Sequence, residues 1–167
     1  MLEFLTYLVV TYGYLGVFLV SLIGSAALFV PLPAFLIVIS AGATLDPFWV
    51  GIVAGLGAGL GETIGYLAGI GIVKGGKKLI KRKLSAKEKH WINLVKDWFN
   101  KGWGPLAIFV FAATPLPDKI LGLVCGAIRY DWKKFLLATL AGKILLHLVL
   151  AYIGYFGIGF FLDLLHL

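Results

Sequence analysis

Hydrophobic residues run through this 167-residue chain in long stretches that prolines, charged residues or short turns interrupt at a few places. Two of the stretches, at residues 49–73 and 135–162, are long enough to cross a bilayer, which takes about 20 helical residues. A polar and strongly basic segment, residues 74–101, separates the two halves of the chain. A short apolar stretch at residues 2–12 comes first, and it is either an interfacial helix or the start of a spanning one.

Two further apolar stretches are each broken by the same tripeptide. Pro31-Leu32-Pro33 lies in VPLPAFLIVISAGA, and Pro115-Leu116-Pro117 lies at the same position of TPLPDKILGLVCGA. Proline has no N–H to donate and clashes with the preceding turn, so two prolines in three residues end a helix. About a dozen apolar residues follow each break before a polar turn, which is too few to cross a membrane. Each break therefore predicts a re-entrant hairpin.

The order hairpin, crossing helix, hairpin, crossing helix predicts an inverted repeat whose hairpin tips meet near the bilayer midplane. We expect one all-α integral membrane domain, with a first repeat at about residues 13–73 and a second at about 103–165. The segment between them, residues 74–102, is expected to be a basic loop and an amphipathic helix that begins at the capping box Ser85-x-x-Glu88 and lies in the membrane interface. Glycines at every fourth position between residues 51 and 69 predict close helix packing.

Composition and charge agree with a membrane protein. Hydrophobic residues make up 60% of the chain and charged residues 14%, and the mean hydropathy is +0.98. Ten of the fifteen basic residues lie within residues 74–101. Because basic loops stay on the cytoplasmic side, we expect a multi-pass protein of the cell membrane with this loop in the cytoplasm. Attraction to anionic lipid headgroups explains the same charges, so nucleic-acid binding is not expected.

Ionisable residues within the apolar segments are the candidates for function, because a charge in hydrocarbon is costly. Glu62 lies in the first crossing segment, and Lys143 and His147 lie one turn apart in the second. The alternative is that these residues pair with one another and only hold the fold together. Asp118 and Lys119 follow the second break, where they could instead cap a helix. Arg129 is either a snorkelling anchor or a ligand for a headgroup phosphate.

The chain resembles the DedA family of membrane proteins, which carry the VTT (SNARE-associated) domain, and is most like its small archaeal or YqaA-like branch. The resemblance rests on FVPLPAFLIVISAGA, GAGLGETIGYLAG and ATPLPDKILGLVCGAIRYDWKKFLLATLAGK. Gly61-Glu62 matches the family's Gly-acid element, and Gly142-Lys143 resembles its Gly-Arg element. Where many members carry acids near the first break and arginines around the second, this chain has Gly24, Ser25 and Ala34, and Ala112 and Ala113. The resemblance implies facing re-entrant loops and lipid movement between leaflets, with polyprenyl phosphates or phospholipids as substrates.

We therefore expect a flippase or scramblase for an anionic lipid, with Glu62 as a candidate proton-coupling acid. Two alternatives remain open at this point: a proton- or cation-coupled transporter of a small solute, and a scaffold that transports nothing. Expected partners are membrane lipids with anionic headgroups, and self-association is left open. The sequence has no nucleophile motif, no HExxH and no phosphate-binding loop, so we expect neither an enzyme nor a cofactor or bound metal.

Overall fold

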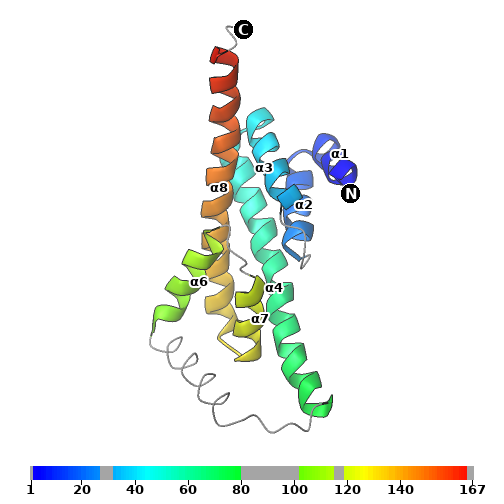
Figure 1. Ribbon diagram of the computed structural model, residues 1–167, viewed down its shortest axis with the longest axis vertical. Helices are drawn as coiled ribbons and strands as arrows, with labels where there is room; N and C mark the ends of the chain where they lie inside the picture. Colours follow the sequence, from blue (N-terminus) through cyan, green and yellow to red (C-terminus); the bar gives the residue numbers. More distant parts are fainter. Residues whose placement is uncertain (1, 27–31, 80–101, 115–118, 165–167) are drawn as a thin grey trace.

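The computed structural model describes residues 2–26, 32–79, 102–114 and 119–164, and within these ranges every regular element is a helix. The all-α prediction is therefore confirmed for this part of the chain. The helices, shown in Figure 1, are α1 (Leu2–Tyr12), α2 (Tyr14–Ala26), α3 (Leu32–Thr44), α4 (Pro47–Leu79), α6 (Gly104–Ala112), α7 (Lys119–Ala127) and α8 (Trp132–Leu164).

Two long helices, α4 and α8, form the axis of the molecule and run in opposite directions (Figure 1). Within them, Pro47–Gly71 and Trp132–Gly157 are long and apolar enough to cross a membrane. They correspond to the two predicted crossing segments. Helix α4 continues beyond the predicted end at Val73 to Leu79, so its last turns contain lysines that were expected in the loop.

Glycines set the distance between these helices and their neighbours. Along one stripe of α4, Gly51, Gly55 and Gly59 contact Leu148, Ile144 and Leu140 of α8. A Cβ atom on Gly51 would lie only 2.6 Å from the Cα atom of Leu148, so the two backbones are nearly in contact. The second stripe contacts other helices, with Gly57 and Gly61 against α2 and Gly69 against α7. The predicted role of both stripes in close packing is confirmed.

The two halves of the chain pack in the same pattern. In the first half, α2 packs on its own long helix, α4, while α3 packs on α8. In the second half, α6 packs on its own long helix, α8, while α7 packs on α4. In each half, the second short helix therefore packs on the long helix of the other half. The orientation of the two repeats in a membrane stays a prediction.

Helix α1 is separate from α2, which answers the question that the sequence left open about residues 2–12. Gly13 lies between the two helices with a φ of +56°, a left-handed conformation that glycine adopts without strain. With 11 residues, α1 is about 16 Å long, roughly half the thickness of the hydrocarbon core. Residues 2–12 are therefore not the start of a continuous spanning helix.

Several predictions concern residues outside the described ranges. These are Pro31, Pro115, Leu116, Pro117 and Asp118, and the amphipathic helix expected between Ser85 and Lys101. Leu32, Pro33 and Lys119 lie in the first turns of helices, but their side chains are likewise outside the description. Helices α2 and α6 end before the two breaks, and α3 and α7 begin at or after them, as the proline positions predicted. Whether these helix pairs are re-entrant hairpins stays a prediction.

Candidate functional site

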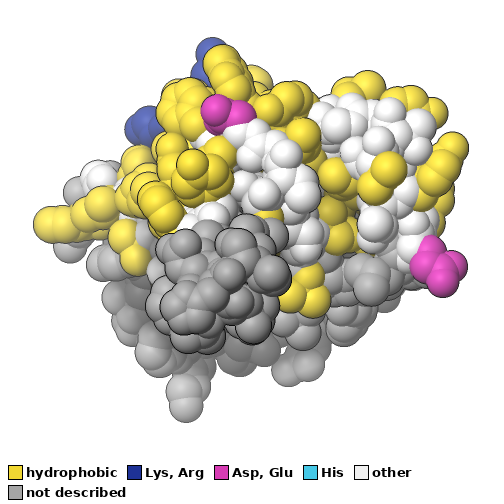
Figure 2. Space-filling view, turned by 90° about the horizontal axis from the view of Figure 1, so that it is seen from above, with side chains coloured by type: hydrophobic (Ala, Val, Ile, Leu, Met, Phe, Trp, Pro, Cys, Tyr) yellow, Lys and Arg dark blue, Asp and Glu magenta, His cyan; other side chains and the backbone are white. Residues whose placement is uncertain are grey.

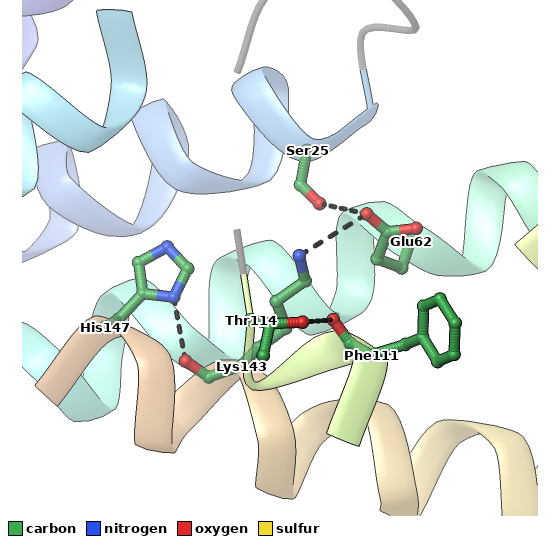
Figure 3. A network of polar contacts seen from close by, with 6 residues as sticks. All are labelled: Ser25, Glu62, Phe111, Thr114, Lys143 and His147. Atoms are coloured by element: carbon green, nitrogen blue, oxygen red, sulfur yellow. Dashed lines mark hydrogen bonds and ion pairs between the residues drawn. The ribbon is translucent and has the colours of Figure 1, made fainter. Parts of the chain in front are cut away.

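Glu62 of α4 and Lys143 of α8 form an ion pair between the two long helices. The Lys143 Nζ atom lies 3.7 Å from Glu62 Oε1, and both residues are almost completely buried, at 4% and 3% exposure. Figure 3 shows the pair between the end of α2 and the ribbon of α8. Two of the sequence candidates, drawn from different halves of the chain, are thus brought together.

The positions of the two charges follow from the glycines that precede them. Gly61 contacts the last turn of α2 at Leu22, Ser25 and Ala26. Gly142 contacts the last turn of α6 at Phe109, Ala112 and Ala113, with the same residue spacing. In each half a glycine therefore lets the first short helix end directly against the long helix. The charged residue that follows this glycine then lies beside the end of that short helix.

Ser25 and His147 complete the polar centre (Figure 3). Ser25 Oγ donates a hydrogen bond of 3.0 Å to the same Glu62 oxygen that faces Lys143. His147 is buried one turn after Lys143, and its Nδ1 donates to the Lys143 carbonyl at 2.8 Å, because a carbonyl can only accept. The edge of the Phe35 ring from α3 packs against the imidazole, with ring centroids 6.0 Å apart.

Pairing is what allows these charges to remain buried. An isolated carboxylate or ammonium in an apolar interior costs several kcal/mol, and a partner with additional hydrogen bonds offsets much of that cost. The hydrophobic core is divided around the pair: one cluster contains Val50, Ala54 and Ala151, and another contains Tyr66 and Phe135. Along both long helices, Glu62 and Lys143 lie between the two clusters. The centre is a polar layer in an otherwise apolar core.

Ser21 of α2 adds a second serine to this polar layer, and it was not identified from the sequence. Its hydroxyl is buried, at 2% exposure, and has no hydrogen-bond partner among the described residues. It lies one turn before Ser25, whose bond to Glu62 the sequence also did not reveal. A pair of small hydroxyl residues one turn apart, just before a proline break, is the signal that could have found both.

Arg129 lies outside this cluster, although the sequence placed it among the candidates. It is exposed in the turn between α7 and α8, with a φ of +55°. The N–H of Tyr130 donates to the Cys125 carbonyl at 2.9 Å and that of Arg129 to the Gly126 carbonyl at 3.1 Å, which closes α7 with a Schellman motif. The hydroxyl of Tyr66 also donates to the Tyr130 carbonyl and ties this turn to α4.

The turn that contains Arg129 belongs to a basic end of the molecule. Lys133 and Lys134 are exposed in the first turn of α8, and the last turns of α4 contain Lys74, Lys77 and Lys78. Because α4 and α8 are antiparallel, these positions lie at the same end (Figure 1). The neighbouring Asp131 caps α8, and hydrogen bonds from the backbone of Lys134 and Lys133 lower the pKa of its carboxyl group.

Comparisons with known proteins identify the family of this sequence. The sequence model of the VTT domain matches residues 32–156, a range that begins in α3 and includes both Glu62 and Lys143. An uncharacterized protein of the archaeon Methanocaldococcus jannaschii is 30% identical over 147 residues. The similar region covers 87% of this chain and 86% of that relative. No solved structure matches the chain.

Proposed function

Because this chain belongs to the VTT-domain (DedA) family of membrane proteins, we propose that it moves an anionic lipid between the leaflets of the cell membrane. The substrate class is a lipid with a phosphate headgroup, such as a polyprenyl phosphate or a phospholipid. In this proposal the headgroup passes through the polar centre while the hydrocarbon tails stay in the bilayer.

The buried Glu62–Lys143 pair is the observation that carries the proposal. A cation that is already paired with a carboxylate can exchange that partner for a phosphate, which is also negatively charged. Lys143 supplies the cation, and the Ser25 hydroxyl supplies a donor beside it. In this proposal the phosphate takes the place of Glu62 beside Lys143, and Glu62 is the proton-coupling acid of the transport cycle. Binding of the headgroup would therefore be coupled to uptake of a proton.

The proline breaks fit the same route. If α2–α3 and α6–α7 are re-entrant hairpins, the N-terminal ends of α3 and α7 point into the membrane, where free N–H groups attract an anion. Asp118 and Lys119 would then lie at the mouth of the second half-helix. Lysines at the shared end of α4 and α8 orient the protein, because the positive-inside rule assigns this end to the cytoplasm.

Reconstitution into liposomes tests the proposal. Transbilayer movement of a labelled phospholipid and of a labelled polyprenyl phosphate would be followed for the wild type and for Glu62→Gln/Lys143→Met. The double substitution removes both charges of the pair together, so we expect a folded protein that has lost lipid movement. Lys133→Met, in the exposed first turn of α8, is the matched control and should retain it.

Other outcomes would reject the proposal. If the wild type moves neither lipid above empty liposomes, with or without a pH gradient, lipid transport is excluded and a solute transporter or a scaffold becomes the better hypothesis. If the double variant moves lipid as fast as the wild type, the pair is structural and the route lies elsewhere. Loss in the Lys133 control as well would point to a nonspecific charge effect.

A further inference from the structure

A second polar site lies at the end of the molecule opposite the basic turn. A cavity of about 460 Å³ opens between the α3–α4 connection and α8. Its lining includes Thr44, Asp46 and Phe48 on one side and Tyr152 and Tyr155 on the other. Figure 2 looks onto this end of the molecule, where an acidic side chain stands among hydrophobic ones and basic side chains are seen only at the margin.

Asp46 is the one charged residue among the described residues that line the cavity, and it is held in place by its neighbours. Its Oδ1 atom accepts hydrogen bonds from the N–H groups of Phe48 at 2.9 Å and Trp49 at 3.2 Å, which caps α4. The backbone N–H of Asp46 donates to the hydroxyl of Tyr14 at 3.3 Å. Among the described residues, Oδ2 accepts no hydrogen bond. The partial positive charge of a helix N-terminus is about half a unit, so a net negative charge remains at the cavity.

Aromatic rings make up much of the remaining wall, and they support one another. Phe48 packs edge-on against Trp49, with ring centroids 5.6 Å apart. Phe156 stacks on Tyr152 at 6.0 Å and meets Tyr155 edge-on at 5.2 Å. A carboxylate in a cavity that aromatic rings also line suits an alkylammonium group, because the negative charge and the ring faces both attract a cation.

An apolar groove continues from this cavity along α8. It has a volume of about 400 Å³ and is lined by Leu148, Val149, Tyr152, Ile153 and Phe156. Tyr152 lines both the cavity and the groove, so the two are adjacent. The polar cavity, with the carboxylate of Asp46, matches a lipid headgroup. The adjacent groove of hydrophobic side chains matches an acyl chain.

We propose that this cavity and groove bind a lipid whose headgroup carries a positively charged amine or quaternary ammonium. The ammonium lies against Asp46 and the Tyr152 ring, and an acyl chain lies in the groove. The site has a carboxylate where the Glu62–Lys143 centre offers an ammonium, so it selects a different headgroup. The inference does not rest on the proposed transport function, because it concerns binding at the far end of α4 and α8.

Native mass spectrometry of the detergent-solubilised full chain with phosphatidylcholine tests the proposal. Asp46→Asn keeps an oxygen that can cap α4 and removes the charge, so the fold should be retained while phosphatidylcholine binding weakens by about fivefold. Tyr152→Leu should weaken binding by a similar factor, whereas Tyr152→Phe keeps the ring and should bind like the wild type. The matched control is Asp131→Asn, which changes the equivalent cap of α8 at the basic end and should leave binding unchanged.

Competition with phosphatidylglycerol of the same acyl chains tests the headgroup. We expect phosphatidylglycerol to displace bound phosphatidylcholine poorly. Displacement by both lipids to the same extent would overturn the proposal, as would phosphatidylcholine binding that is unchanged in Asp46→Asn. In either case the aromatic residues at this end act only as an interfacial anchor. These results do not depend on lipid movement, so each proposal can fail without the other.

Discussion

The two halves of the molecule share a backbone plan and differ in the charge that they place at its centre. In both, a glycine on the long helix contacts the final turn of the first short helix, Gly61 against α2 and Gly142 against α6. The residue that follows is an acid in one half and a base in the other. The Ser25 hydroxyl donates to Glu62, and the backbone carbonyl of Lys143 accepts from His147.

This difference is what makes the polar centre possible. If both halves had an acid at this position, or both a base, two like charges would face each other between α4 and α8. Like charges at that separation repel strongly in a medium of low dielectric constant. With opposite charges the two ions, one from each half, offset each other in the pair that the described residues form. The two halves can therefore share the same packing, but they cannot have the same charge at this position.

The largest effect is expected from breaking this asymmetry on one side only. Lys143→Met leaves Glu62 buried without its cation and should lower the free energy of unfolding by about 3–5 kcal/mol. Adding Glu62→Gln to the same chain should recover most of that loss, because it also removes the carboxylate that Lys143 had faced. Unfolding can be followed with a thiol-reactive dye, since Cys125 is the only cysteine and is completely buried.

The exposed Lys133 again provides the control, and Lys133→Met should change the unfolding free energy by less than about 0.5 kcal/mol. If the double variant is as unstable as Lys143→Met alone, the ion pair is not what relates the two halves, and the view that the two charges offset each other fails.

The packing that the halves have in common is tested at the glycines. A Cβ atom on Gly142 would lie 2.6 Å from the Phe109 carbonyl oxygen, and one on Gly61 would lie 2.6 Å from that of Leu22. Gly142→Ala and Gly61→Ala should therefore each destabilise the protein by about 1–3 kcal/mol. In the same α4 helix, a Cβ on Gly71 would meet nothing within 4 Å. Gly71→Ala should instead stabilise by up to about 1 kcal/mol, because alanine is the better helix former.

Thermal unfolding of the three variants measures these changes in stability. The decisive result is whether each substitution destabilises or stabilises the protein. Equal losses at Gly61 and Gly142 support the view that the two halves pack alike. A loss at one of the two and tolerance at the other would show that the similarity of their contacts has no energetic counterpart.

The sequence predicted the elements of this fold better than the relations between them. Crossing helices follow from run length, and the glycine stripes of α4 follow from spacing, so both were predicted. Glu62 and Lys143 were identified because charges are rare in apolar segments. Whether they pair depends on how α4 and α8 are placed against each other, and the sequence left that open. Ser25 was missed as a donor because a serine within an apolar helix commonly bonds only its own backbone.

The break between α1 and α2 marks another limit of sequence reasoning. A glycine such as Gly13 in apolar sequence is compatible with a continuous helix and with a helix end, and only the observed φ of +56° distinguishes them. Arg129 illustrates the reverse case. The polar turn that begins at Arg129 was predicted, but nothing in the residue type of Arg129 indicated the left-handed conformation, more usual for glycine, with which it closes α7.

The smallest effect is expected at the caps of the two long helices, which are alike in geometry. Asp131 accepts from the N–H groups of Lys133 and Lys134 at 2.9 and 3.1 Å, as Asp46 does at α4. These bonds lower the pKa of the Asp131 carboxyl group below its ordinary value of 3.8. A lowered pKa in the folded state means that the ionised cap stabilises the protein above that value and ceases to do so as the pH falls through the folded pKa. Wild type should therefore unfold at a slightly higher temperature than Asp131→Asn from neutral pH down to about pH 4, and the difference should vanish in stronger acid. A difference that persists or grows in acid would mean that the cap acts through its geometry and not through its charge.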